Sequence, residues 1–209
     1  MRTKRTATDG ADRLSPQAFF NAAFKVLGDA GHEALTVDSL CARLKVTKGS
    51  FYHHFANTTE FIAGLLQCWE NTFDQLLQMT DTLDLARLFE AAWLAAVNRP
   101  WEAEAALRSW ANSNPMVAAA VRRVDQKYEA VVGEALLPLI GDPERCRVLA
   151  FTAMCLIAGM QQRPQPFDRE LMLAAQLEFL RTNLGIEFEV DGEQLRVLKL
   201  PRPGGGAGT

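Results

Sequence analysis

The stretch that most constrains the fold of this chain is Thr36–Phe55, TVDSLCARLKVTKGSFYHHF. Thr36 is placed to cap a helix, and apolar residues then recur at the helical spacing i, i+3, i+4, i+7: Val37, Leu40, Cys41 and Leu44. Lys45 and Val46 predict a turn, and Thr47 is the N-cap candidate of a second short helix. Two short helices joined by so tight a turn are typical of a helix-turn-helix.

The second helix is predicted to have one buried and one outward side. On a helical wheel Phe51 and Phe55 lie about 40° apart and should point inward as anchors. The far side and its flanks carry groups that suit phosphates and base edges of duplex DNA: Lys48, Gly49, Ser50, Tyr52, His53 and His54. An ordinary solvated helix face is the alternative, but the coincidence of cap, turn and anchoring rings favours DNA.

The segment LTVDSLCARLKVTKGSFYHHFANTTEFIAGLL resembles the DNA-binding segment of the TetR family of bacterial transcriptional regulators, over about residues 13 to 66. Members are all-helical homodimers that bind palindromic operators and release them when a small molecule binds. The resemblance implies that double-stranded DNA is held here by Thr36, Thr47, Lys48, Gly49, Ser50, Tyr52, His53 and His54.

Two positions depart from the family pattern. Most members have glycine where Lys45 stands, because the residue that ends the first helix is left-handed, and lysine adopts that conformation at a cost of about 1 kcal/mol. Either the turn differs or Lys45 is tolerated because it gains a phosphate, so Lys45 is also a DNA-binding candidate. Many members have lysine where this chain has Thr58, which leaves that phosphate contact unassigned.

Charge is distributed unevenly along the chain. The net charge is −3, but residues 1–56 carry eight Lys/Arg against five Asp/Glu, and residues 57–209 carry fourteen against twenty. Positive charge therefore accompanies the predicted DNA-binding segment. Arg2, Lys4 and Arg5 form a basic arm that either reaches DNA or only aids solubility. The sequence has no apolar run of about 20 residues and no secretory signal. We therefore expect the protein to be cytoplasmic and not associated with a membrane.

The remaining sequence predicts an all-α fold of about nine helices. An N-terminal arm and helix-turn-helix domain is expected over 1–56, a helical ligand-binding and dimerisation domain over 57–184, and a short β-hairpin and disordered tail over 185–209. Helices are predicted at about 57–79, 82–98, 101–112, 115–137, 143–162 and 168–184, after a first helix that starts at Ser15-Pro16 and stops at Gly31. The hairpin is placed around the turn signal Asp191-Gly192.

A homodimer is expected, because one helix-turn-helix contacts too few base pairs to specify an operator. The last two predicted helices are the candidate interface, and the first of them offers Ala150, Ala153, Met154 and Ile157. The helix at 168–184 has two apolar stripes, of which one could face the chain's own core and the other a partner: Leu173, Leu177, Leu180 and Leu184, and Met172, Ala175 and Phe179. Burial of both helices within one subunit is the alternative. An unknown small-molecule effector is expected in the second domain, with candidate contacts Phe89, Trp93, Trp101, Arg108, Trp110, Met154 and Gln161.

Catalysis is not expected. The motifs of hydrolases, metalloproteases and nucleotide-binding enzymes are missing, and His53 and His54 point about 100° apart on a helix, so they cannot chelate one metal. No cofactor or metal is predicted, and the four cysteines are interpreted as packed free thiols, with a redox sensor as the alternative. The favoured function is a repressor released by a ligand. The alternatives are an activator or partner-controlled regulator, and a small-molecule-binding protein without operator binding.

Overall fold

A computed structural model of the chain describes residues 15–78 and 85–200. These residues form nine α-helices, one 3-10 turn and a two-stranded sheet. The helices are α1 Pro16–Ala30, α2 Val37–Leu44, α3 Lys48–His54, α4 Thr58–Gln78, α5 Leu85–Val97, α6 Trp101–Ala111, α7 Pro115–Ile140, α8 Pro143–Gln161 and α9 Arg169–Leu184; the turn η1 is His32–Ala34, and the strands are β1 Glu187–Asp191 and β2 Gln194–Lys199. The all-α prediction with a small hairpin is confirmed.

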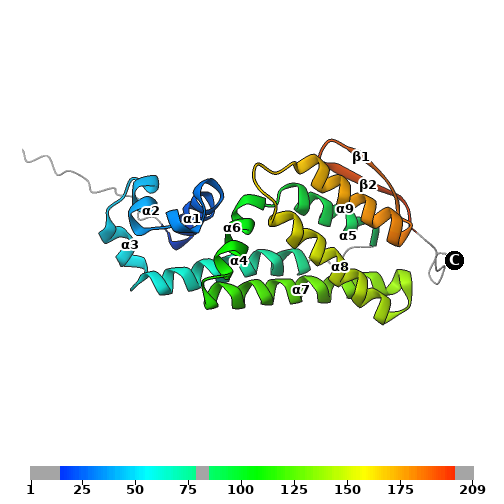
Figure 1. Ribbon diagram of the computed structural model, residues 1–209, viewed down its shortest axis with the longest axis horizontal. Coiled ribbons are helices and arrows are strands. Elements are labelled where there is room, and N and C mark those ends of the chain that lie inside the picture. Colours follow the sequence, from blue (N-terminus) through cyan, green and yellow to red (C-terminus); the bar gives the residue numbers. More distant parts are fainter. Residues whose placement is uncertain (1–14, 79–84, 201–209) are drawn as a thin grey trace, which may run out of the picture.

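The helices form an elongated molecule with α1, α2 and α3 at one end and the hairpin at the other (Figure 1). We call residues 15–55 the head and residues 85–200 the body. A core of aromatic rings holds the head to α4, since Phe19, Phe51, Phe55 and Phe61 are all buried. Helix α4 passes close to α1 at Gly64. A Cβ on this residue would lie only 2.8 Å from the ring of Phe20. Glycine is therefore needed there for the close approach.

The core of the head continues into the body. Helices α6 and α7 contribute buried residues to the same cluster, including Leu107, Val117 and Val124. A second cluster lies at the far end, where α5, α7, α8 and α9 pack with the hairpin, and a third lies between α6, α8 and α9. The head therefore packs directly against α4, α6 and α7.

The hairpin packs on the body, as expected for a pair of strands too small to be stable alone. Phe188 and Leu195 are buried in the far core, and the N–H of Val197 donates to Glu90 of α5 at 3.1 Å. The turn lies one residue later than predicted, at Gly192-Glu193, with Asp191 paired to Gln194. Gly192 has φ +58°, which side chains disfavour, so the glycine sets the position of the turn.

Several predicted boundaries are corrected. Helix α7 continues past Pro138 to Ile140, because a proline so near the end interrupts little of the hydrogen-bond ladder. At the start of α4, which begins at Thr58 and not at residue 57, Asn57 accepts a hydrogen bond from the N–H of Glu60, and Glu60 accepts one from the N–H of Ala56. The predicted end of the fourth helix at 79, the start of the fifth at 82, the basic arm and the tail after 200 lie outside the described residues.

Candidate DNA-binding surface and ligand cavity

The turn between α2 and α3 is built by backbone geometry at Lys45. Thr36 caps α2 in a reciprocal pair of hydrogen bonds with Ser39, each 3.1 Å long. Lys45 adopts the left-handed conformation at φ 57°, and the next N–H, of Val46, donates to Cys41 at 3.0 Å. The helix therefore ends as it would at a glycine, and lysine takes the less favourable conformation. The Lys45 side chain is exposed.

Helix α3 presents the predicted inward and outward sides. Phe51 is completely buried, and its ring lies 5.7 Å from that of Phe19 and 5.2 Å from that of Phe61. Lys48, Gly49, His53 and Tyr52 are exposed, the last at 52%. The second helix of the motif thus leaves its polar side open, in the manner of a helix that enters a major groove.

Three details of α3 differ from the sequence-based expectation. Thr47 stands at the N-cap position, but its side chain makes no capping hydrogen bond. Phe55 is buried as predicted, yet it follows the helix in extended conformation at φ −132°. His54 is half-buried with its ring 5.8 Å from that of Phe19, so of the two histidines His53 is the more accessible to DNA.

Lys48 is held by a neighbour that the sequence pattern did not identify. Its Nζ lies 2.7 Å from Oδ1 of Asp38 on α2, and both side chains are exposed. The hydrogen bond from Lys48 to Asp38 raises the pKa of the lysine. An acidic residue therefore stands beside the first cation of the DNA-binding helix.

A cavity of about 150 Å³ lies in the body between α5, α7, α8 and α9. Its wall is mainly apolar and includes four aromatic rings, those of Phe89, Trp93, Tyr128 and Phe179. Of the seven predicted ligand contacts, Phe89 and Trp93 line this cavity. Periodicity alone missed Tyr128 and Phe179 because they lie on α7 and α9, whose packing over α5 appears only in the folded chain.

The other predicted ligand contacts lie elsewhere. Trp101 and Met154 are buried in the cluster between α6, α8 and α9. Trp110 packs beside the head, its ring stacked 5.7 Å from His32. Arg108 and Gln161 belong to a polar network inside the body and do not line the cavity.

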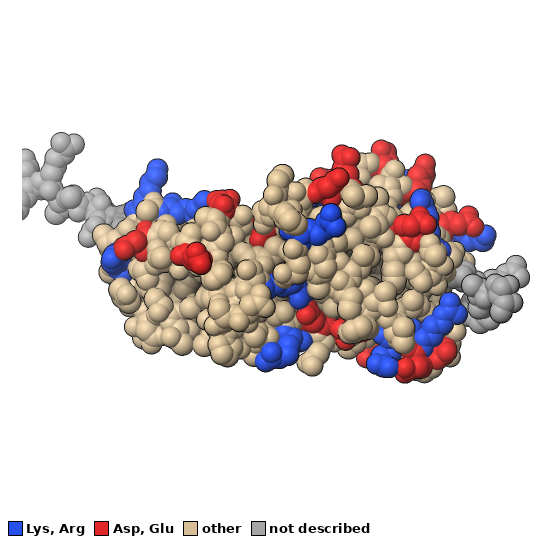
Figure 2. Space-filling model, viewed as in Figure 1, with Lys and Arg blue, Asp and Glu red and all other residues tan. Residues whose placement is uncertain are grey.

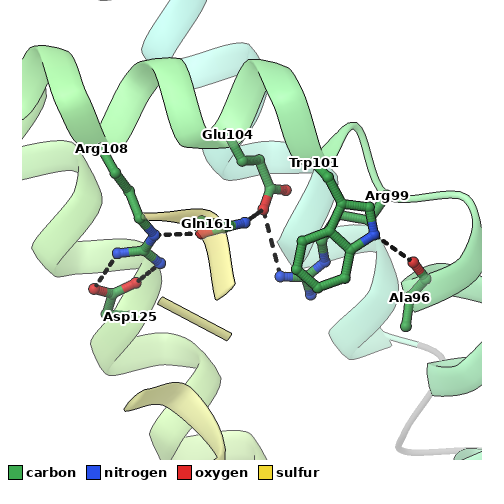
Figure 3. Close-up of polar contacts among 7 residues, drawn as sticks. All are labelled: Ala96, Arg99, Trp101, Glu104, Arg108, Asp125 and Gln161. Carbon is green, nitrogen blue, oxygen red and sulfur yellow. Dashed lines mark hydrogen bonds and ion pairs between the residues drawn. The ribbon is translucent and has the colours of Figure 1, made fainter. Parts of the chain in front are cut away.

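The polar network joins α6 to α7 and α8 (Figure 3). Arg108 donates to both carboxylate oxygens of Asp125, at 2.9 and 2.6 Å, and to Gln161 at 2.5 Å. Gln161 donates in turn to Glu104 at 2.5 Å, and Glu104 lies 3.4 Å from Arg99. Because each charge has a counter-charge, the network is electrically balanced although it is largely buried.

The residues of α8 that remain exposed are not those predicted to contact a second subunit. Ala150, Met154, Ile157 and, on α9, Met172 are buried in the subunit's own core. The apolar residues that remain exposed are Val148, Phe151 and Leu171. Cys155 is also exposed on this face, whereas Cys41 and Cys146 are buried, and burial raises the pKa of both buried thiols.

Comparison with known proteins agrees with the helix-turn-helix geometry. Residues 19–65 match the model of the bacterial regulatory proteins of the tetR family. The similarity to this family therefore spans less than a quarter of the chain. The match covers α1, α2, α3 and the start of α4, the part that presents the tetR-type DNA-binding helix.

One curated relative matches a short segment, which spans less than a third of its length, and solved structures extend the similarity in fold to about four-fifths of the chain. The transcriptional regulator AcuR of Cereibacter sphaeroides is 33% identical over 64 residues, which are 31% of this chain and 29% of AcuR. A transcriptional regulator from Rhodococcus sp. Rha1 is 21% identical over 81% of this chain and 97% of its own, with a TM-score of 0.62. A regulator from Saccharomonospora viridis in complex with choline is 12% identical over 80% and 96%, also at 0.62. The chain therefore shares the fold of these two solved regulators over about four-fifths of its length, and its residues 19–65 are similar to the tetR-family segment.

Among residues 15–78 and 85–200, no helix is long and apolar enough to cross a membrane. The same residues contain no cluster of three or more His, Cys, Asp or Glu side chains that would hold a metal ion. Acidic and basic side chains are interspersed over the end of the molecule that carries the hairpin (Figure 2). That end is the one farthest from the DNA-binding helix in Figure 1.

Proposed function

We propose that this protein is a transcriptional repressor that binds a palindromic operator as a homodimer and releases it when a small molecule enters the body. The observation that carries the proposal is the open polar side of α3, anchored by the buried ring of Phe51. Lys45, Thr47, Lys48, Gly49 and Ser50 would contact phosphates or base edges together with Thr36, Tyr52, His53 and His54.

The experiment that tests the proposal is a gel shift with the DNA upstream of the protein's own gene, over a series of salt concentrations. Specific binding with an affinity that falls steeply with salt is expected, since each phosphate neutralised contributes about 0.9 to the slope of log K against log salt. Failure to bind any duplex at low salt would instead favour a small-molecule-binding protein without operator binding. Activation of transcription in a reporter assay would favour the activator.

The Tyr52→Ala variant is expected to bind the operator at least about tenfold more weakly, with an unchanged melting temperature. The side chain is half-exposed, so its removal costs the core little, while a tyrosine in the groove loses both its ring contact and its hydroxyl. Tyr52→Phe is the matched control, because it keeps the ring and removes only the hydroxyl. Full affinity in the alanine variant would place Tyr52 outside the groove.

Asp38→Asn is expected to raise DNA affinity several-fold at low salt and to steepen its salt dependence. The substitution releases Lys48 from its 2.7 Å ion pair and removes a negative charge from beside the phosphates. Both changes are measured in the same titration. Weaker binding by the asparagine variant would mean that Asp38 positions Lys48 or accepts a hydrogen bond from a base.

The dimer is proposed to form through α8 and α9, with the exposed residues Val148, Phe151 and Leu171 at its centre. A twofold arrangement sets two copies of α3 about one DNA turn, roughly 34–36 Å, apart. These apolar side chains would otherwise remain in water. The buried side of α8 completes the subunit core and leaves this outer side for a partner.

Phe151→Glu is expected to convert the protein to a monomer, because a carboxylate at the centre of an apolar interface is costly to desolvate. Light scattering after size exclusion measures the change. Leu94→Glu is the control, since Leu94 of α5 is exposed to a similar degree, 51% against 55%, on another helix. A dimer that survives in Phe151→Glu would move the interface elsewhere.

Effector binding is proposed for the cavity between α5, α7, α8 and α9. The fold is compatible with such a role, since the relative from S. viridis was solved with choline. A ligand that favours one spacing of the two heads by 1–3 kcal/mol changes operator affinity about 5- to 150-fold. Helices α4 and α6 both join the body to the head, so either can transmit the change.

A further inference from the structure

We propose that the cavity of about 150 Å³ takes a neutral, ring-sized apolar molecule with one hydrogen-bond acceptor, and that the indole N–H of Trp93 receives that acceptor. The proposal deepens the effector role proposed above and rests on the same cavity. Its basis is a buried indole N–H without a described hydrogen-bond partner in a mainly apolar wall, together with the pairing of the nearby charges.

The size of the cavity limits the ligand. An apolar protein cavity of about 150 Å³ stays dry and binds benzene. The cavity here has a similar volume, and its wall of four aromatic rings and several aliphatic side chains favours a compact hydrocarbon body. A ligand of one ring with a short substituent therefore fits the space between α5, α7, α8 and α9.

The unpaired donor indicates that the ligand carries an acceptor. Trp93 is 7% exposed and lines the cavity, and its Nε1 is buried without a hydrogen-bond partner among the described residues. Buried N–H groups in folded proteins nearly always have partners, because an unpaired one is destabilising. A ligand carbonyl or ether oxygen beside Trp93 would satisfy this donor. Tyr128, in the same wall, offers a hydroxyl as a second polar group.

The charges around the cavity indicate that the ligand is neutral. Among the described residues that line the cavity, Arg99 is the only charged one, and its side chain is 11% exposed. It faces Glu104 at 3.4 Å and lies over the ring of Trp101 at 5.3 Å. A ligand anion would have to compete with Glu104 for Arg99. A ligand cation would be attracted by the aromatic rings but repelled by Arg99.

Four molecules of similar size separate these cases: acetophenone as the neutral acceptor, ethylbenzene without an acceptor, benzoate as the anion and benzylammonium as the cation. Calorimetry on the full-length protein without DNA measures their binding. Acetophenone is expected to bind about tenfold more tightly than ethylbenzene. Benzoate and benzylammonium are expected to bind more weakly than ethylbenzene. Tighter binding of either ion, or no binding of acetophenone at millimolar concentration, overturns the proposal.

Two variants assign the donor. Trp93→Phe keeps an aromatic ring and removes the N–H, so acetophenone should lose its preference over ethylbenzene. Tyr128→Phe is the near-isosteric comparison and should keep most of that preference. A ratio unchanged in Trp93→Phe assigns the acceptor elsewhere and overturns the role of Trp93. If the Trp93 variant does not fold, the comparison of the four probes on the unaltered protein still decides the class of ligand.

Failure of this proposal is distinguishable from failure of the proposed regulatory function. Binding is measured without DNA, whereas operator binding and its release are measured by gel shift. Acetophenone that binds in a Trp93-dependent way without changing operator affinity supports the ligand class and contradicts the regulatory link. Operator binding that is unaffected by any probe, together with no calorimetric signal, overturns the ligand class and leaves the DNA-binding function intact.

Discussion

Phe55→Ala is expected to lower the free energy of unfolding by about 3–5 kcal/mol. The ring of Phe55 is 5% exposed and lies between 5.0 and 5.8 Å from the rings of Phe61, Phe51, Phe20 and Phe19. Alanine would leave a cavity where α1, α3 and α4 meet. Because Phe55 follows α3 in extended conformation, the substitution alters packing without changing the propensity of the helix itself.

Chemical denaturation followed by circular dichroism measures the loss. Tyr52→Ala serves as the control, because it also removes an aromatic side chain from the region but one that is half-exposed. We expect a large fall in the denaturation midpoint for Phe55→Ala and little change for Tyr52→Ala. Equal effects of the two substitutions would mean that the inward and outward sides of α3 are wrongly assigned.

Asp125→Ala is expected to destabilise the protein by about 3 kcal/mol, because it leaves the charge of Arg108 buried and uncompensated. The Arg108 side chain is 10% exposed, and its guanidinium donates to both oxygens of Asp125. After the substitution, the described contact that remains to it is the amide oxygen of Gln161. The neutral double variant Arg108→Met/Asp125→Leu should recover most of the stability, since it removes both charges at once.

The pair formed by Arg147 and Glu144 is the matched control for this prediction. Arg147 also donates to both carboxylate oxygens of its partner, at 3.0 and 2.6 Å, but the two side chains are 72% and 70% exposed. Glu144→Ala should therefore change stability by less than about 1 kcal/mol. Similar losses for Asp125→Ala and Glu144→Ala, measured by denaturation, would contradict the view that burial makes the Arg108 pair important.

Local features of the fold were predictable because neighbours within about four residues decide them. The cap at Thr36, the stop at Gly31 and the burial of both Phe51 and Phe55 depend on such short-range spacing, and the structure agrees with all three. The exact position of the hairpin turn and the side-chain cap of α3 were less well predicted. The turn moved to Gly192-Glu193, and the side chain of Thr47 does not cap α3.

The candidate ligand site was only partly predictable. Aromatic residues on α5 were correctly associated with a cavity at Phe89 and Trp93, but Trp101 and Trp110 have the same sequence signal and pack elsewhere. Whether an aromatic ring faces a cavity or a core depends on which helix lies opposite. Periodicity contains no information about that neighbour, so Tyr128 and Phe179 were not identified.

The amino-acid sequence by itself determined the helices, the helix-turn-helix and the polar side of α3, because caps, turn residues and apolar spacing act over a few residues. Tertiary structure alone decided the partner of Lys48, the side of α8 that is buried and the polar network of the body. In that network Arg108 and Gln161 are 53 residues apart, and Gln161 and Glu104 are 57 apart. Contacts between such distant residues follow from how whole helices pack, which no local pattern specifies.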